Sequence, residues 1–178
     1  MTQTAGAWIA DPEAYRKKLE GLLGRRDPFE VMSGTAEVLN DIVHKHTTAQ
    51  MRSRPFEGKW TPNEVIGHLV DSEWVYGFRM RLILSEDAPK ILGMDQELWV
   101  AAQRHNERDP MDLVNTFRDL RGHNLAIWRQ MKPADLNRVG VHNERGNESL
   151  GMMLRMLAGH DLSHIDQITR YLSAVKGK

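Results

Sequence analysis

Proline residues at helix starts constrain this chain more than any other feature of its sequence. Proline suits the first position of a helix, because it lacks the N–H that would stay unpaired there and its φ angle is already helical. In four of five cases the preceding residue is Asp or Thr, whose side chain can cap the first turn. The five steps are Asp11-Pro12, Asp27-Pro28, Thr61-Pro62, Asp109-Pro110 and Lys132-Pro133. Each of them predicts the start of a helix.

Apolar residues downstream of these starts recur every three or four positions, which keeps them on one helix face. This spacing predicts four long helices, which run from Pro28 to near Arg52, from Pro62 to about Ser85, from Pro110 to Met131 and from Ser149 to Val175. Shorter helices are expected at Pro12–Leu23 and Asp95–Gln103, and a polar loop or small turn at 137–146. The chain is therefore expected to be all-α, a four-helix bundle with short accessory helices.

The 178 residues are a usual size for one domain. We predict an N-terminal extension with a short helix at residues 1–27 and the bundle at residues 28–178. The 24 Lys and Arg residues balance 24 Asp and Glu residues, so the long-range attraction of a nucleic-acid or membrane-surface binder is absent, and we expect neither partner. No apolar run reaches the roughly 18 to 20 residues that span a bilayer, and the start of the chain lacks the apolar centre of a signal peptide. We expect a cytoplasmic protein.

The chain contains no cysteine, which excludes disulfides, thiolate metal sites and a cysteine nucleophile. Any metal must therefore bind nitrogen or oxygen, and eight histidines supply nitrogen. His160 and His164 lie four residues apart within the apolar stripe of the last predicted helix, so both rings can reach one ion. The best-placed third ligand is His68, two turns after the capped start at Thr61. Spacing alone leaves an alternative open, in which the pair are core histidines bonded to neighbours such as Asp161.

Two stretches of the sequence resemble the signature regions of the DinB/YfiT-like superfamily. They run from Trp60 to Ser72 (WTPNEVIGHLVDS) and from His160 to Ile168 (HDLSHIDQI). Further landmarks extend the resemblance over roughly residues 29–172, namely Arg79, Pro89, Asp95, Trp99, Trp128, and Gly140 with His142. The resemblance implies a bundle in which one histidine of the second long helix and two of the fourth hold a divalent metal. His68, His160 and His164 match those three positions.

Three imidazoles on an ion that keeps open positions form the catalytic kind of metal site, because a structural site fills every position with protein. Such an ion can lower the pKa of bound water or of a thiol. Imidazole ligands suit several metals, and we expect Zn²⁺ or Ni²⁺. Groups that accept the other ring N–H fix the orientation of each ligand, and the candidates are Asp71, Asp161 and Gln167.

Two residues are candidates for a substrate pocket. Arg79 follows His68 by three turns on nearly the same face, where it could meet an anionic substrate or pair with Glu86 or Asp119. His142 precedes the last helix and could shape the mouth of the pocket or a turn. His105 is expected at the surface.

The leading hypothesis is a metal-dependent enzyme that acts on a small-molecule substrate. The resemblance implies a thiol-dependent S-transferase or a hydrolase, with a low-molecular-weight thiol as a candidate cosubstrate. The alternative is a noncatalytic bundle whose metal stabilises the fold or a dimer. We also expect a homodimer, because the second long helix has apolar residues on more than one side and DinB-like proteins often associate through bundle helices. Trp74 and Phe78 could instead pack against residues 95–103.

Overall fold

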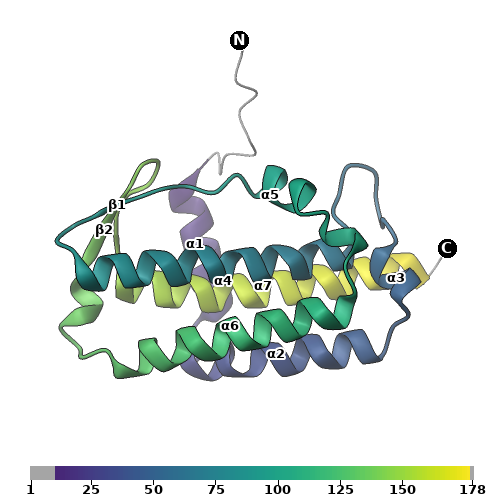
Figure 1. The fold of residues 1–178 in the computed structure, drawn as a ribbon, viewed down its shortest axis with the longest axis horizontal. Helices are drawn as coiled ribbons and strands as arrows, with labels where there is room; N and C mark the ends of the chain where they lie inside the picture. The colour runs from purple at the N-terminus through teal and green to yellow at the C-terminus, as the bar shows by residue number, and fades with distance from the viewer. Residues whose placement is uncertain (1–10, 177–178) are drawn as a thin grey trace, which may run out of the picture.

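The computed structural model describes residues 11–176, so the first ten residues of the predicted extension and the last two of the predicted bundle lie outside the described part. Four long helices lie alongside one another (Figure 1), and α2 contacts α6, α6 contacts α4, α4 contacts α7, and α7 contacts α2. They are α2 (Pro28–His44), α4 (Pro62–Ser85), α6 (Pro110–Gln130) and α7 (Leu150–Lys176). The predicted four-helix bundle is confirmed. No helix within residues 11–176 is long and apolar enough to cross a membrane.

The predicted caps open four of the helices. At the start of α4, the Thr61 hydroxyl accepts the Glu64 N–H at 3.1 Å, and the Glu64 carboxylate accepts the Thr61 N–H at 2.7 Å. The Asp27 and Asp109 side chains accept first-turn N–H groups of α2 and α6, without the return bond that Glu64 makes at Thr61. The fifth step was predicted wrongly, because Pro133 lies in a turn before a short 3₁₀ helix, η2 (Asp135–Asn137). The preceding Lys132 offers no side-chain acceptor for a cap.

The first long helix is shorter than predicted. Its helical hydrogen bonding ends at His44, and a separate short helix, α3 (Thr48–Arg52), follows after a turn. Thr47 has extended backbone angles and forms a reciprocal cap with Gln50, whose side chain accepts the Thr47 N–H at 2.9 Å. The sequence Thr-x-x-Gln is itself a helix-start pattern, and it overrides the apolar spacing that predicted one continuous helix to Arg52.

A small sheet occupies one end of the bundle, where a loop or small turn was predicted for residues 137–146 (Figure 1). Its strands are β1 (Lys90–Ile91), β2 (Val139–His142) and β3 (Gly146–Ser149). β2 pairs antiparallel with β3 and parallel with β1. Strands of two to four residues are too short to show alternation in a sequence. Between β1 and α6 lie α5 (Gln96–Ala102) and the 3₁₀ helix η1 (His105–Glu107).

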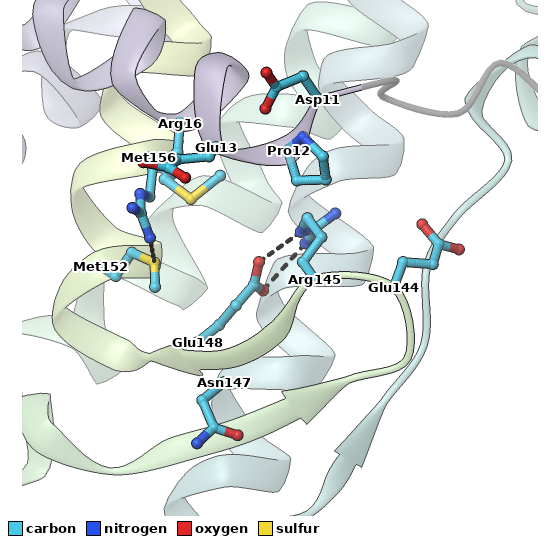
Figure 2. A pocket seen from close by; sticks show the side chains of 10 residues that line it. All are labelled: Asp11, Pro12, Glu13, Arg16, Glu144, Arg145, Asn147, Glu148, Met152 and Met156. Carbon is cyan, nitrogen blue, oxygen red and sulfur yellow. Dashed lines mark hydrogen bonds and ion pairs between the residues drawn. The ribbon is translucent and has the colours of Figure 1, made fainter.

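The short N-terminal helix α1 (Pro12–Leu23) crosses the bundle and packs on α7 (Figure 1). Its contact side is apolar, since Leu19 and Leu23 are each only 1% exposed. Gly159 on α7 permits this approach, because a Cβ at that position would lie 2.2 Å from the Leu19 carbonyl oxygen. The N-terminal turn of α1 faces the β2–β3 hairpin across a cavity (Figure 2). α1 thus covers the middle of α7, where the predicted metal ligands lie.

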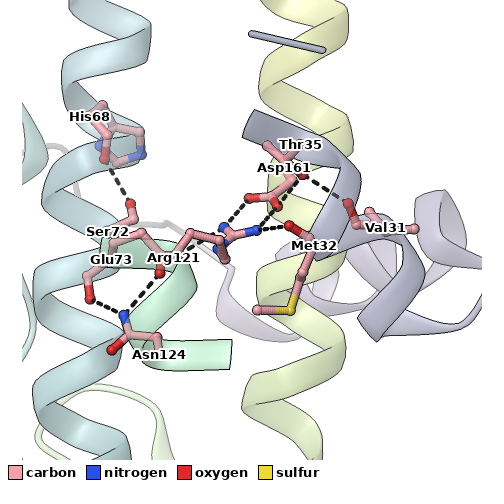
Figure 3. A network of polar contacts seen from close by, with 9 residues as sticks. All are labelled: Val31, Met32, Thr35, His68, Ser72, Glu73, Arg121, Asn124 and Asp161. Carbon is pink, nitrogen blue, oxygen red and sulfur yellow. Dashed lines mark hydrogen bonds and ion pairs between the residues drawn. The ribbon is translucent and has the colours of Figure 1, made fainter. Parts of the chain in front are cut away.

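The bundle core has two apolar clusters with a polar layer between them. One cluster is centred on residues such as Leu69, Phe117 and Ile168, and the other on residues such as Met80 and Trp128. The residues between them along the four helices are polar and buried (Figure 3), namely Thr35, Glu73, Arg121, Asn124 and Asp161. The metal-ligand candidates lie at the same level of the bundle, so the site is set into an otherwise apolar core.

Candidate metal centre

Three histidine rings from two helices converge in the middle of the bundle. His68 comes from α4, and His160 and His164 come from successive turns of α7. The Nε2 atom of His160 lies 3.1 Å from Nε2 of His68 and 3.0 Å from Nε2 of His164. His68 and His160 are buried, and His164 is half-buried. The structure therefore brings together the three residues that the sequence singled out.

Burial keeps these rings neutral. It lowers the pKa of His68 and His160 well below the ordinary value, and the neighbouring His164 lowers both further. Burial likewise lowers the pKa of His164 to about 4. At neutral pH each ring therefore has one nitrogen with a free lone pair, which is the form that binds metal.

The geometry of the three nitrogens fits a divalent ion. A proton on one Nε2 atom can form a well-aligned hydrogen bond to only one other nitrogen, so no placement of the ring protons satisfies both close pairs around His160 well. A cation between the three nitrogens satisfies all of them at once. Two metal–nitrogen bonds of about 2.0–2.1 Å at a tetrahedral angle put their nitrogens about 3.3 Å apart, which is close to the observed separations. The donor set therefore fits a metal with room for further ligands.

One of the three predicted orienting residues bonds a ring of the cluster. The side-chain oxygen of Gln167 lies 2.7 Å from Nδ1 of His164, so it can accept that ring's N–H and leave the Nε2 lone pair pointing inward. Gln167 is in turn held by Tyr171, to whose hydroxyl its amide donates at 3.0 Å. The Nδ1 atoms of His68 and His160 have no hydrogen-bond partner within residues 11–176.

Asp71 bonds a different histidine. Its carboxylate contacts Nε2 of His105 at 2.9 Å and accepts the Gln103 amide at 2.8 Å. The prediction that His105 lies at the surface is wrong, since it is 1% exposed and packs over Gly67, where a Cβ would lie 2.2 Å from its ring. Asn63 donates to the His105 carbonyl. Asn63, Gly67 and Asp71 follow one another at intervals of four, and this face of α4 holds the segment after α5 in place.

Asp161 bonds an arginine that sequence analysis missed. Arg121 of α6 makes two hydrogen bonds to the Asp161 carboxylate, at 2.6 and 3.0 Å, and pairs with Glu73 at 2.8 Å (Figure 3). Burial alone would lower the pKa of Arg121, but the two carboxylates outweigh burial and raise it. The signal was present in the sequence, since Arg121 follows Phe117 by four residues on the apolar face of its helix. Asp161 therefore fixes the turn of α7 that carries His160 rather than bonding a ring.

Two cavities adjoin the histidines. The inner cavity, of about 60 Å³, is lined by His68 and His160 together with Tyr15, Ser72, Val75, Tyr76, Arg79, Met94, Gln96 and Arg145. The outer cavity, of about 280 Å³, is lined by His164 together with Tyr15, Lys18, Gly58, Lys59, Trp60, Gln96, Glu97, Ser163, Gln167 and Tyr171. Tyr15 and Gln96 line both cavities. The metal-ligand candidates therefore lie where two separate spaces meet.

The two predicted pocket residues differ in position. Arg79 lines the inner cavity and pairs with neither Glu86 nor Asp119; it donates to the Leu92 carbonyl. His142 is buried in β2, where its Nδ1 accepts the Glu144 N–H, and it is not among the residues that line the inner cavity.

Trp74 and Phe78 are 61% and 66% exposed. The alternative in which they are covered by residues 95–103 is therefore wrong.

Comparison with known proteins agrees with this fold. The chain belongs to the DinB superfamily, whose family model matches residues 32–168. A relative from Oceanobacillus iheyensis, named "Putative metal-dependent hydrolase", is 29% identical over 133 residues, which cover 74% of this chain and 76% of the relative. YfiT of Bacillus subtilis, which carries the same description, is 24% identical over 147 residues, covering 80% and 82% of the two chains.

The solved structure of Bacillus subtilis YfiT has a similar fold. It superposes with a TM-score of 0.74 at 22% sequence identity, and the match covers 92% of this chain and 90% of that chain. It is described as "a probable metal-dependent hydrolase with an unusual four-helix bundle topology". At this level of identity the likeness concerns the fold.

Proposed function

We propose that the protein is a metal-dependent enzyme of small molecules, in which His68, His160 and His164 hold one divalent ion, Zn²⁺ or Ni²⁺. The observation that carries this proposal is the convergence of three neutral ring nitrogens at the junction of two cavities. The names of the relatives support the metal dependence. An ion held there would supply a Lewis acid that lowers the pKa of water or of a thiol near neutral pH.

The arrangement of the cavities supports a reaction between two reactants. A reactant in the inner cavity lies against His68 and His160, and one in the outer cavity lies against His164. A thiol-dependent S-transferase has to bring a thiol and an electrophile together in this way, and a hydrolase needs only a water beside one substrate. We therefore propose the transferase type, with a low-molecular-weight thiol as cosubstrate, and keep hydrolysis as the second outcome of the test.

Residues around the ion prepare the site. Gln167 orients the His164 ring, because its side-chain oxygen accepts the N–H at Nδ1 of that ring. Burial raises the pKa of Tyr15, so its phenol keeps its proton at neutral pH and can donate a hydrogen bond to a reactant in either cavity. The two apolar clusters exist without any metal contact, which supports a bundle that folds without its ion and argues against a purely structural metal.

The test begins with protein purified without a nickel column, so that elemental analysis reports the native metal. We expect about one ion per chain, and activity with thiols and electrophilic acceptors that disappears on chelation and returns with metal. Esters and amides without a thiol test the hydrolase outcome. If neither class is turned over, and chelation unfolds the helices, the noncatalytic alternative replaces this proposal.

Matched variants connect the metal to the named residues. His164→Ala removes one ligand and should lose most of the bound metal, whereas His123→Ala, an exposed histidine of α6, should keep it. Gln167→Ala should lower metal affinity by about 10- to 100-fold, because the ring then loses its orienting partner. Equal metal content in the His164 and His123 variants would show that the cluster does not bind the ion.

A further inference from the structure

Arg79 is a buried cation without a counter-anion. Its side chain is 4% exposed, yet within residues 11–176 no carboxylate lies within ion-pair distance of it. The other buried arginine, Arg121, pairs with two carboxylates. Burying a charge is costly unless it is paired, so the unpaired state of Arg79 calls for an explanation.

The guanidinium of Arg79 is held in place, but not all of its hydrogen-bond donors have a partner within residues 11–176. One Nη atom donates to the Leu92 carbonyl, and the guanidinium lies 5.2 Å from the centre of the Tyr76 ring. Its Nε–H is buried and has no hydrogen-bond partner in the part of the chain that the structure describes. Burial lowers the pKa of Arg79, but a guanidinium stays protonated in proteins. A fixed, charged donor therefore remains free beside the inner cavity.

The inner cavity suits an anion of one charge. The second arginine that lines it, Arg145, is held by both carboxylate oxygens of Glu148, at 2.5 and 3.1 Å (Figure 2). Neither Asp nor Glu is among the residues that line the cavity, and Glu144, which also acts on Arg79, is exposed to solvent. Arg79 thus supplies one uncompensated positive charge, which matches a carboxylate better than a dianionic phosphate.

The size of the cavity agrees with such a group. A cavity of about 60 Å³ holds a few waters or a group of a few heavy atoms. Val75 and Met94 give the cavity apolar walls for a carbon chain, and His68 and His160 line it as well. A carboxylate on Arg79 would therefore lead the rest of a small molecule toward the candidate ion.

We propose that the small-molecule substrate carries a carboxylate, which enters the inner cavity and pairs with Arg79. This inference rests on the proposed function for its catalytic meaning, but the binding of the anion does not need the metal. The planar guanidinium presents donors that match the two oxygens of a carboxylate. Arg79 is then the residue that selects acids over their neutral analogues.

Nuclear magnetic resonance of the full chain tests this directly, with propionate as the probe and propionamide as its uncharged analogue. The Arg79 Nε–H resonance, identified by its loss in Arg79→Gln, should move downfield saturably with propionate and stay unmoved with propionamide. Arg79→Gln should bind propionate about tenfold more weakly or worse, as expected for a lost hydrogen bond to a charged group. Arg81→Gln, an exposed arginine on the same helix, should bind like the unchanged protein.

The alternative is that Arg79 only anchors the Leu92 segment and the Tyr76 ring. Arg79→Lys keeps the charge and should keep a preference for propionate over propionamide, whereas a purely structural role predicts no such preference in any variant. An Nε–H resonance that ignores propionate, or equal affinity in Arg79→Gln, overturns the inference. Methylphosphonate binding more tightly than propionate would also overturn it, in favour of a phosphate-type ligand.

The titrations are run on metal-free and metal-loaded protein, and metal content is measured on the same samples. Failure to bind metal counts against the proposed function alone, and failure to bind propionate in both forms counts against this inference alone. Propionate binding that requires metal and is unchanged in Arg79→Gln would place the anion on the ion, which also contradicts the proposal.

Discussion

Replacing Arg121 with Met should strongly destabilise the protein, because two buried carboxylates then lose their cation. Asp161 is fully buried and Glu73 is 1% exposed. The lost contacts are two hydrogen bonds to Asp161, one ion pair with Glu73 and one hydrogen bond to the Met32 carbonyl. Methionine keeps an apolar stem of similar shape, so the change removes charge with little loss of volume.

The expected magnitude follows from the burial of the network. Removing one partner of a buried ion pair costs about 3–5 kcal/mol, and here both carboxylates are left unpaired, which places the loss at the upper end. A domain is typically stable by about 5–15 kcal/mol. For a chain of this size each kcal/mol lowers the melting temperature by about 2–4 °C, so a loss near 5 kcal/mol should lower it by roughly 10–20 °C.

Urea unfolding followed by circular dichroism at pH 7 measures this loss. Arg118→Met is the matched control, since Arg118 lies on the same helix and, among residues 11–176, its side chain bonds only those of Asn115 and Asn40. A loss of about 1 kcal/mol is expected. Adding Glu73→Gln and Asp161→Asn to Arg121→Met should recover much of the stability, because no charged side chain then remains among these three positions. A loss below about 1 kcal/mol, or no recovery in the triple variant, would refute the reasoning.

Further predictions concern the metal ion, the stability of the protein at acid pH, the packing of α1 on α7, and the homodimer. Chelation should remove the metal while the helical circular dichroism persists; coincident loss of both signals would contradict a catalytic site in a self-sufficient bundle. Acid should destabilise the metal-free protein between about pH 6.5 and pH 4, because burial lowers the pKa of His164 to about 4 and the unfolded chain binds more protons in that range; urea midpoints at pH 7 and pH 5 would test this. Gly159→Ala should cost about 1–3 kcal/mol, since its Cβ would lie 2.2 Å from the Leu19 carbonyl oxygen; unchanged urea unfolding would contradict this packing. The exposed Trp74 and Phe78 predict a homodimer, so light scattering should report twice the 20.4 kDa chain mass, and Trp74→Ser with Phe78→Ser should lower it to one chain.

Local signals in the sequence predicted the helices well. The caps at Asp27, Thr61 and Asp109 and the three-and-four apolar spacing gave the long helices, and three of the four agree to about one residue with the structure. These signals act within one or two turns, so they are readable without knowledge of the fold. The main error is the prediction of one continuous helix from Pro28 to Arg52. The cap at Thr47 that ends this continuity is also a local signal, but the prediction rested on the apolar spacing instead.

Only the tertiary structure decided which polar residues meet. The sequence placed His160 and His164 on one face, but the choice of His68 as their neighbour depends on how α4 packs against α7. Asp71 and Asp161 were both candidates to bond the rings, yet in the folded protein Asp71 bonds His105 and Asp161 bonds Arg121. Such pairings join residues dozens of positions apart, and no local spacing encodes them. The cost of burying a charge requires that each find a partner, and the fold determines which partner is within reach.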